Sequence, residues 1–234
     1  MNWHWFSRQG TQRQHNHDAA SLVVAHDYVF AMIVDAAEKG SDGAGLARYW
    51  TQTIALKLSE LAGLPTHDQV MEVMRSAHLS LRDHYICERA AYCAILLHTQ
   101  GQQAWFISCG DCRLGIKQDA KITWLSNVHT LANFNGEEFS ATHLSDPNRH
   151  TLTRCLKARS FTKPDVIQFD WPIDPSKVSS LCLCSDGYWA EHIGHGVRLE
   201  LLEDDASFLE LSDFLTPIPV SQTNSDCDNF LFLE

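Results

Sequence analysis

The stretch Ser21-Leu-Val-Val-Ala-His-Asp-Tyr-Val-Phe-Ala-Met-Ile-Val-Asp35 decides the fold. It holds two apolar runs, 21–26 and 28–35, which are separated by the single acidic residue Asp27. Short β-prone runs on either side of a tight turn predict a β-hairpin. The second predicted strand ends in Asp35, so the hairpin places a carboxylate where a buried strand meets a turn.

Four other aspartates occupy similar stretches, in which a strand would end against a turn. They are Asp18, Asp111, Asp186 and Asp228. Clustered carboxylates repel one another and resist desolvation, so a chain keeps such a set together only if cations neutralise it. Taken singly, each aspartate is equally compatible with an ordinary turn or helix-cap residue.

The rest of the chain divides into regions of distinct periodicity. Apolar residues recur every three or four positions in 44–61 and 68–82, and Gly63-Leu64-Pro65 separates these segments, which predicts two antiparallel helices. The polar segment 126–149 is predicted to form loops. The other predicted strands are 91–98, 104–109, 113–117, 122–125, 166–169, 178–184 and 230–233, and the other predicted helices are 150–157, 188–192 and 206–215. Strands and helices that come in separate groups indicate a layered α+β fold.

Composition narrows the class of protein. The 234 residues are 44% hydrophobic and suit a single domain, 1–234, with one large core. Against 29 acidic side chains stand only 18 basic ones, a formal charge of −11, which argues against nucleic acid or an anionic membrane as partner. The N-terminus has no secretory signal pattern and no run approaches a membrane span, so we expect a cytoplasmic protein.

The eight cysteines leave two interpretations open. Cys109 and Cys112, with Cys182 and Cys184, have spacings compatible with a four-thiolate zinc site or a redox site. They are equally compatible with small buried apolar residues, because both pairs lie within strand-like runs. His129 lies beside one of the aspartate stretches, and we interpret it as a structural histidine that hydrogen-bonds a loop.

Six short motifs follow one another in a recognisable order. They are Arg13-x-x-Asn16-x-Asp18, Val34-Asp35, Gly110-Asp111-x-Arg113, Leu125-Ser126-x-x-His129, Ser185-Asp186-Gly187 and Asp228-Asn229. The series resembles the motif set of the metal-dependent Ser/Thr protein phosphatases, the type 2C or PPM family, in a divergent form similar to bacterial members. The resemblance implies an α+β β-sandwich of two antiparallel sheets flanked by helix pairs, in α-β-β-α layers.

The resemblance also implies a reaction and its partners. A phosphatase of this family hydrolyses phosphoserine and phosphothreonine by attack of a water that bridges two divalent cations, Mn²⁺ or Mg²⁺. The substrate would be a phosphoprotein, and a cognate Ser/Thr kinase pathway would supply it in signalling. Oxygen ligands do select hard cations such as these, and paired cations activate water and offset charge on phosphoryl oxygens.

Individual roles follow from the same resemblance. Asp35 would bridge the two cations, with the backbone carbonyl of Ala36 helping to hold one of them. Asp186 and Asp228 would ligate the other cation, and Asp111 together with Asp186 would hold a third, weaker one.

Two further residues would complete the catalytic set. Asp18 would hold metal-bound water in the outer shell, and Arg13 would grip the substrate phosphate as a planar bidentate donor. Ala36 replaces the family's usual glycine, and His17 stands where Glu or Gln is usual. These departures motivate an alternative function, in which a catalytically weak or inactive relative binds a phosphoprotein or regulatory partner.

Overall fold

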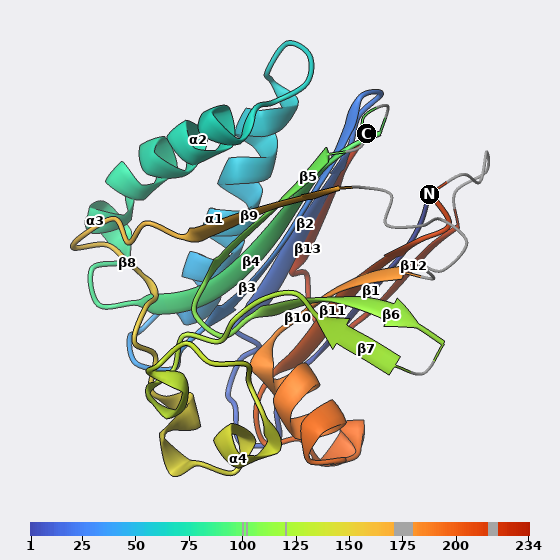
Figure 1. Cartoon of the computed structure of the whole chain (residues 1–234). Helices are drawn as coiled ribbons and strands as arrows, with labels where there is room; N and C mark the ends of the chain where they lie inside the picture. Colours follow the sequence, from blue (N-terminus) through green and yellow to red (C-terminus); the bar gives the residue numbers. More distant parts are fainter. Residues whose placement is uncertain (100, 102, 120, 171–179, 215–219) are drawn as a thin grey trace.

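Two β-sheets pack face to face, and a pair of helices covers the outer side of one of them (Figure 1). The computed structural model describes residues 1–99, 101, 103–119, 121–170, 180–214 and 220–234. The first sheet, called the β3 sheet, contains in spatial order β13 (Phe230–Leu233), β2 (Asp18–Val24), β3 (Tyr28–Ala36), β4 (Arg89–His98), β5 (Gln103–Cys109) and β9 (Asp165–Asp170), while β8 (Leu156–Lys157) pairs with β4. The second, called the β10 sheet, contains β12 (Ser221–Ser225), β1 (Asn2–Arg8), β11 (Ala206–Ser212), β10 (Ser180–Cys184), β6 (Arg113–Gln118) and β7 (Lys121–Trp124). The predicted α+β sandwich is confirmed.

The predicted hairpin forms the centre of the β3 sheet. β2 and β3 pair antiparallel from Val24↔Val29 to Asp18↔Asp35, and β4 pairs with the other side of β3. Eight of the nine β3 residues are buried, because one face meets the other sheet and the opposite face meets helices. A strand covered on both faces reads as the continuous apolar run seen in the sequence.

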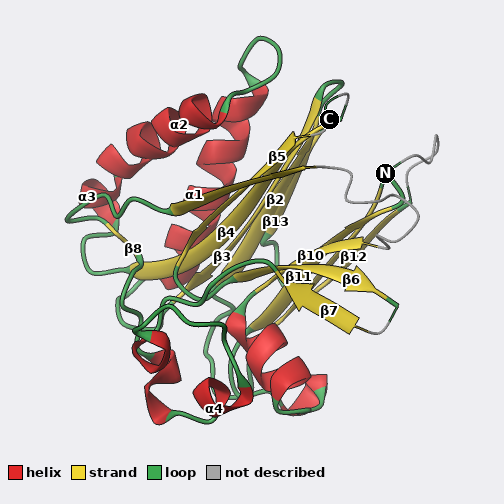
Figure 2. Cartoon of the chain, in the orientation of Figure 1, coloured by secondary structure: helices red, strands yellow, loops and turns green. Residues whose placement is uncertain are grey.

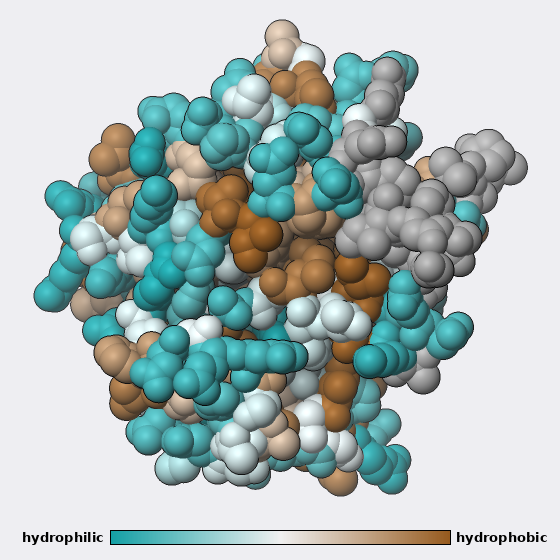
Figure 3. Space-filling view, in the orientation of Figure 1, coloured by the Kyte–Doolittle hydropathy of each residue, from teal (hydrophilic) through white to brown (hydrophobic). Residues whose placement is uncertain are grey.

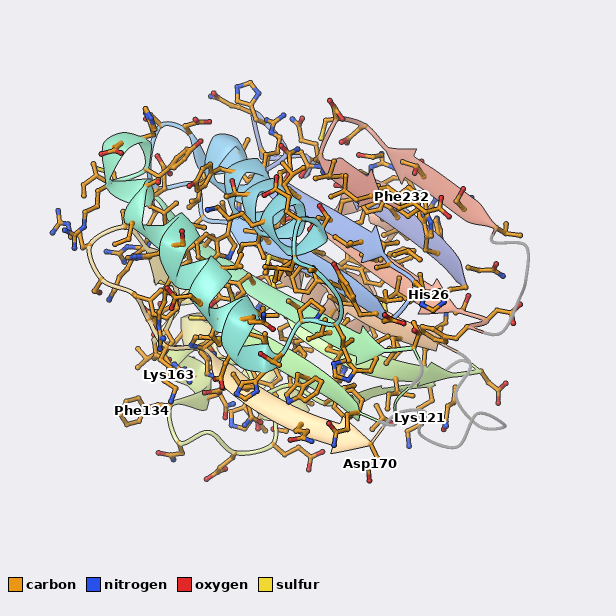
Figure 4. The ribbon with its side chains drawn as sticks, turned by 90° about the horizontal axis from the view of Figure 1, so that it is seen from above. His26, Lys121, Phe134, Lys163, Asp170 and Phe232 are labelled. Carbon is orange, nitrogen blue, oxygen red and sulfur yellow. The ribbon has the colours of Figure 1, made fainter. Side chains whose placement is uncertain are left out.

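Helices α1 (Gly43–Ser59) and α2 (His67–Leu79) lie across the outer face of the β3 sheet, as Figure 2 and the view from above in Figure 4 show. Both begin with a capped turn: the Asp42 carboxylate accepts from the Gly45 N–H, and Thr66 and Gln69 form a capping box. Their buried sides join the apolar cluster formed by the outer face of β3 and β4. The antiparallel helix pair predicted from 44–61 and 68–82 is confirmed.

Short helical turns make up the remaining described helices. They are α3 (Leu81–His84), η1 (Leu131–Asn133), α4 (Ala141–Leu144), η2 (Pro147–His150), the π-helix η3 (Gly187–Gly194) and η4 (Leu199–Leu201). Of these, η3 packs on the outer face of the β10 sheet, where Trp189 and Ala190 meet Cys182, Cys184 and Phe208, and Leu144 of α4 packs against the same cluster. A second helix pair, which α-β-β-α layers would require, is absent from the described residues on that side.

Some predicted elements were wrong. Segment 206–215 was predicted to be a helix, but 206–212 form β11, whose backbone is paired on one side by β1 and on the other by β10. Segment 150–157 was also predicted to be a helix, but only His150 belongs to a helical turn, η2, and the chain then continues through a bend to β8. In both cases pairing with neighbouring strands overrides local periodicity. The first two residues of predicted strand 178–184 lie outside the described residues.

The chain ends complete the two sheets. β1 was not predicted, although Trp3 and Trp5 alternate with His4 and Phe6 along it. β12 was not predicted either, because its sequence is wholly polar. β12 pairs parallel with β1, and β13 pairs parallel with β2, so neither sheet is purely antiparallel.

The surface agrees with the acidic composition. On the face drawn in Figure 3, hydrophilic side chains predominate, and apolar ones gather where the edges of the two sheets approach each other. Within the described residues, no helix combines the length and the apolar character needed to cross a membrane.

The packing of α1 predicts a contrast between two of its residues. Ile54 is fully buried, whereas Leu56 on the same helix is 46% exposed. We expect Ile54→Ala to lower the free energy of unfolding by about 2–5 kcal/mol, and Leu56→Ala to lower it by about 1 kcal/mol at most. Urea denaturation of the two variants measures both values, and equal losses would contradict the packing of α1 on β3.

Candidate functional site

An acidic cavity of about 210 Å³ lies at the end of the sandwich. Four aspartates line it, each delivered by a different part of the fold: Asp35 by β3, Asp111 by the turn between β5 and β6, Asp186 by the end of β10, and Asp204 by the loop before β11. The other lining residues are Arg13, Ala36, Ala37, Glu38, Lys39, Ala91, His150 and Leu152. The fold therefore brings together Arg13, Asp35, Ala36, Asp111 and Asp186 of the predicted set.

Asp35 and Asp18 face each other across the hairpin, because β2 and β3 pair in that register. Asp18 is only 1% exposed; its Oδ2 accepts from the Ser185 hydroxyl at 2.8 Å, and its Oδ1 has no hydrogen-bond partner among the described residues. Burial, together with the charge of Asp205, raises the pKa of Asp18 well above its ordinary value. Burial and the neighbouring Asp18 and Asp186 raise the pKa of Asp35 in the same way.

Asp111 depends on the conformation of the residue before it. Gly110 has φ +107, and a Cβ there would lie 2.4 Å from the Ala91 Cβ, so only glycine fits this turn. The Gly110 N–H donates to His129 Nδ1 at 3.0 Å, and His129 Nε2 lies 2.8 Å from Asp165 Oδ2. His129 thus holds the turn, as a structural histidine would. Burial raises the pKa of Asp111 to about 7.

Asp186 stands just before the π-helix and meets two basic residues from η2. Arg149 Nη1 lies 3.7 Å and His150 Nδ1 3.8 Å from Asp186 Oδ2, and Arg149 also faces Glu191 at 3.6 Å. Burial, followed by the charges of Asp111 and Asp204, raises the pKa of Asp186 well above its ordinary value. The sequence prediction missed both residues, because Arg149 ended the segment interpreted as loop, 126–149, and His150 began the predicted helix 150–157.

Asp204 is the carboxylate that the sequence prediction missed. It lines the cavity, and Arg13 contacts its Oδ1 through Nη2 at 2.6 Å. The adjacent Asp205 is buried and accepts from the backbone N–H groups of Gly10 at 2.9 Å and His17 at 2.8 Å. The sequence did contain a signal, because the acidic pair Asp204-Asp205 directly precedes an apolar run. This run, 206–215, was interpreted as a helix, so the pair was not recognised as the end of a loop before a strand.

Asp228, in contrast, does not reach the cavity. Its side chain is exposed, and Arg48 contacts only its backbone carbonyl, at 3.4 Å. The next residue, Asn229, is buried, and its side-chain amide is hydrogen-bonded through both its nitrogen and its oxygen. The amide nitrogen donates to Ser7 Oγ and to the carbonyl of Asp18, and Oδ1 accepts from the Trp5 indole. The Asp228-Asn229 pair therefore fixes the C-terminal turn against β2, and Asp204 stands at the cavity instead.

Arg13 is engaged by two acidic residues. Besides Asp204, its Nη1 lies 2.7 Å from Glu38 Oε2. Glu38 is the more exposed partner, with 42% of its side chain accessible. An anion that entered the cavity would compete with both carboxylates for the guanidinium group.

No family model matches the chain, and neither does any curated protein. Solved structures do match. Serine/threonine phosphatase Stp1 from Staphylococcus aureus superposes with a TM-score of 0.74 at 13% identity, over 90% of this chain and 94% of that chain. The PPM Ser-Thr phosphatase MsPP from Mycobacterium smegmatis gives 0.71 at 20% identity, over 91% and 98%. This chain has the PPM phosphatase fold. The Mycobacterium tuberculosis phosphatase PstP/Ppp agrees, with a TM-score of 0.64 at 16% identity, over 89% and 97%.

The two departures from the usual PPM motifs have structural consequences. Ala36 is the last residue of β3, and its φ is not positive, so the alanine causes no backbone strain there. His17 donates its backbone N–H to Asp205, and its Nδ1 is buried without a hydrogen-bond partner among the described residues. The backbone strain that a missing glycine would cause therefore does not arise.

The donor set of the acidic cavity fits divalent cations. Four aspartates line it together with Ala36, and the buried Asp18 Oδ1 behind Asp35 has no hydrogen-bond partner in the part of the chain that the structure describes. As the side chains lie, no three His, Cys, Asp or Glu residues in the described chain already form a metal-binding group. Arg13 and Arg149 supply the counter-charge in this arrangement, so cation binding would require the aspartates to rotate toward the cavity.

The cysteines do not support the zinc interpretation. Cys109 belongs to the apolar cluster under the helices, Cys112 to the cluster between the sheets, and Cys182 and Cys184 to the cluster under η3. Burial raises the pKa of Cys112 well above its ordinary value. Among the residues that the structure describes, no group of cysteines is arranged to hold a metal ion, and these four thiols pack as small apolar residues.

The raised carboxyl pKa values predict a pH effect on the metal-free protein. Unfolded aspartate titrates near pH 4, whereas folded Asp111 titrates at about 7, so only the folded chain holds this proton between those values. Stability from this group is therefore lost as pH rises from about 4 through 7. Relative to Asp111→Asn in EDTA, the wild-type melting temperature should fall by at least roughly 2–4 °C between pH 5 and 7.5.

The Asp111→Asn reference is needed because several partly buried histidines have lowered pKa values and act in the opposite direction. Their contribution cancels in the difference between the two proteins. The quantity to follow is the melting temperature of the wild type minus that of Asp111→Asn. If this value stays constant or grows as pH rises, Asp111 is not held protonated in the folded chain.

Proposed function

We propose that this chain is a divalent-metal-dependent protein phosphatase of the PPM family that hydrolyses phosphoserine and phosphothreonine. The observation that carries the proposal is the convergence of Asp35, Asp111, Asp186 and Asp204 on one cavity that also contains Arg13. These residues come from positions 13 to 204, so their meeting is a property of the tertiary fold. Four carboxylates around an open cavity repel one another unless cations join them.

The structure suggests which atoms would hold the cations. Asp35 would hold cations together with the Ala36 carbonyl. Asp186 and Asp204 would supply the other carboxylates, and Asp111 with Asp186 would hold a third, weaker ion. When bound, such cations lower the pKa of water and offset charge on the phosphoryl oxygens.

The chain's own residues would bind and orient the substrate. Arg13 would exchange Glu38 and Asp204 for phosphate oxygens, to which its guanidinium can donate in bidentate fashion. Lys39 and His150 also line the cavity and would face the same anion. Asp18, hydrogen-bonded by Ser185 behind Asp35, would act through ordered water and hold the Asp35 carboxylate in place.

Protein substrates suit the position of this cavity, which lies on the surface at the end of the sandwich rather than in a closed pocket. A serine/threonine kinase would produce those substrates. No side-chain nucleophile is needed, since the attacking group is water. Cys109 and Cys112 are therefore not required for the reaction.

The central prediction separates two aspartates. Asp204→Asn should lower kcat/KM for Mn²⁺-dependent hydrolysis of p-nitrophenyl phosphate by at least about 100-fold, because it removes a ligand charge at nearly constant volume. Asp228→Asn should keep activity within about twofold of wild type, since this side chain is exposed and away from the cavity. Asp186→Asn serves as the positive control and should behave like Asp204→Asn.

Calorimetry with Mn²⁺ makes the result decisive. Loss of activity in Asp228→Asn, with Asp204→Asn unaffected, would restore the ligand assignment made from the sequence and reject the one made from the fold. A folded wild-type protein that neither turns over phosphate esters nor binds Mn²⁺ would favour the alternative function. In that case the engagement of Arg13 by Glu38 and Asp204 would belong to a phosphoprotein-binding or regulatory module.

A further inference from the structure

A second cavity, of about 220 Å³, opens near the first and is lined by Ile86, Cys87, Glu88, Arg89, Lys157 and Arg159. Three of these side chains are cationic and exposed, in a chain whose formal charge is −11. Within the described part of the chain, none of the three forms an ion pair. Such a concentration of unpaired cations calls for a functional explanation.

Glu88 is the anionic residue of this cavity, and the loop after β3 engages it. Its Oε1 accepts from the backbone N–H groups of Ser41 at 2.7 Å and Asp42 at 3.0 Å, and the residue is only 3% exposed. Its carboxylate is therefore directed into the protein. The exposed surface of the cavity, which we call the basic pocket, is cationic.

The fold holds the cations of the basic pocket together against their repulsion. Arg89 of β4 and Lys157 of β8 stand directly opposite in an antiparallel pair, where like charges destabilise a sheet. Arg82 of α3 fixes the chain beyond β8 by donating to the carbonyls of Ala158 at 3.3 Å and Arg159 at 3.0 Å. Figure 1 shows α3 and β8 at this same end of the β3 sheet. A bound anion would relieve the repulsion.

The basic pocket adjoins the acidic cavity. Arg89 precedes by two residues Ala91, which lines the acidic cavity, and residues two apart on a strand share a face at a spacing of about 7 Å. The N–H of Ala37, another lining residue, donates to the Arg89 carbonyl at 2.9 Å.

We propose that the basic pocket binds a second anionic side chain of the phosphoprotein substrate, close in sequence to the phosphorylated residue. This inference rests on the proposed function of the acidic cavity. In an extended peptide, side chains two residues apart share a face at about 7 Å, the same spacing that Arg89 and Ala91 have along β4. Two arginines and a lysine provide bidentate and point-charge donors, which suit either a phosphate or a carboxylate. The substrates would be multiply phosphorylated or acidic segments.

Three phosphothreonine peptides test the proposal. The peptides differ only at the two positions that lie two residues before and two residues after phosphothreonine. Both positions hold alanine in the first peptide, aspartate in the second and phosphoserine in the third. With wild-type enzyme and Mn²⁺, we expect kcat/KM for the phosphoserine peptide to exceed that for the alanine peptide by about tenfold, with the aspartate peptide between them. In Arg89→Gln/Lys157→Gln, the three values should converge to within about twofold.

The control variant is Lys121→Gln, an exposed cation on β7, which is the last strand of the β10 sheet, whereas Arg89 and Lys157 belong to strands of the β3 sheet. It should retain the wild-type preference. All variants should hydrolyse p-nitrophenyl phosphate at the wild-type rate, since this ester cannot reach both sites. Equal wild-type kcat/KM values for the three peptides, or a preference that survives in Arg89→Gln/Lys157→Gln, would overturn the proposal.

Fluorescence anisotropy in EDTA separates failure of this proposal from failure of the phosphatase function. Labelled peptides should bind in the same order without turnover, and inorganic phosphate should compete with them less in the double variant. Binding that depends on Arg89 and Lys157 in a protein without phosphatase activity would retain the basic pocket and reject the proposed reaction. Phosphatase activity that does not depend on the second anion would retain the proposed reaction and reject the role of the basic pocket.

Discussion

The repulsion between Asp18 and Asp35 is the constraint on which the rest of the structure depends. The register of the β2–β3 hairpin sets these carboxylates directly opposite one another, at the end of a strand pair whose other residues are almost all buried. Water cannot solvate both groups well, so the fold must supply protons, hydrogen bonds or positive charge. The strand ends, loops and chain termini around the hairpin supply these protons, hydrogen bonds and positive charges.

Hydrogen-bond donors inside the protein satisfy part of this requirement. Ser185 donates to Asp18, and Asn229 donates to the carbonyl of the same residue from the far end of the sequence. The C-terminal segment thereby pairs with both sheets and fixes the turn that carries Asp18. Nearby Asp205 is satisfied in a different way, by backbone N–H groups of the N-terminal loop. Each acidic residue behind the cavity has its own set of donors.

The remaining supply is ionic and comes from outside the sheets. Arg13 lies in the loop between β1 and β2 and contacts Asp204, while Arg149 of η2 faces Asp186. An arginine held by a carboxylate at an open cavity can exchange partners, whereas one buried in the core cannot without a large desolvation cost. The basic pocket is a second place where positive charge lies close to these carboxylates, since its exposed cations stand beside the negatively charged acidic cavity. Opposite fields at adjacent sites would orient an anionic peptide before it binds.

The sequence by itself determined the hairpin that ends in Asp35, the helix pair α1 and α2, and most strands of the β3 sheet. These elements have strong periodicity or long apolar runs, so local pattern and tertiary environment agree. It also singled out Arg13, Asp35, Asp111 and Asp186, which line one cavity, because each lies in a short motif; their roles there remain a prediction. Only the tertiary structure decided that Asp204, and not Asp228, stands at the cavity. The reason is that β11 is a central strand whose pairing with β1 and β10 overrides its helical periodicity, and this pairing places the loop before it beside Asp186.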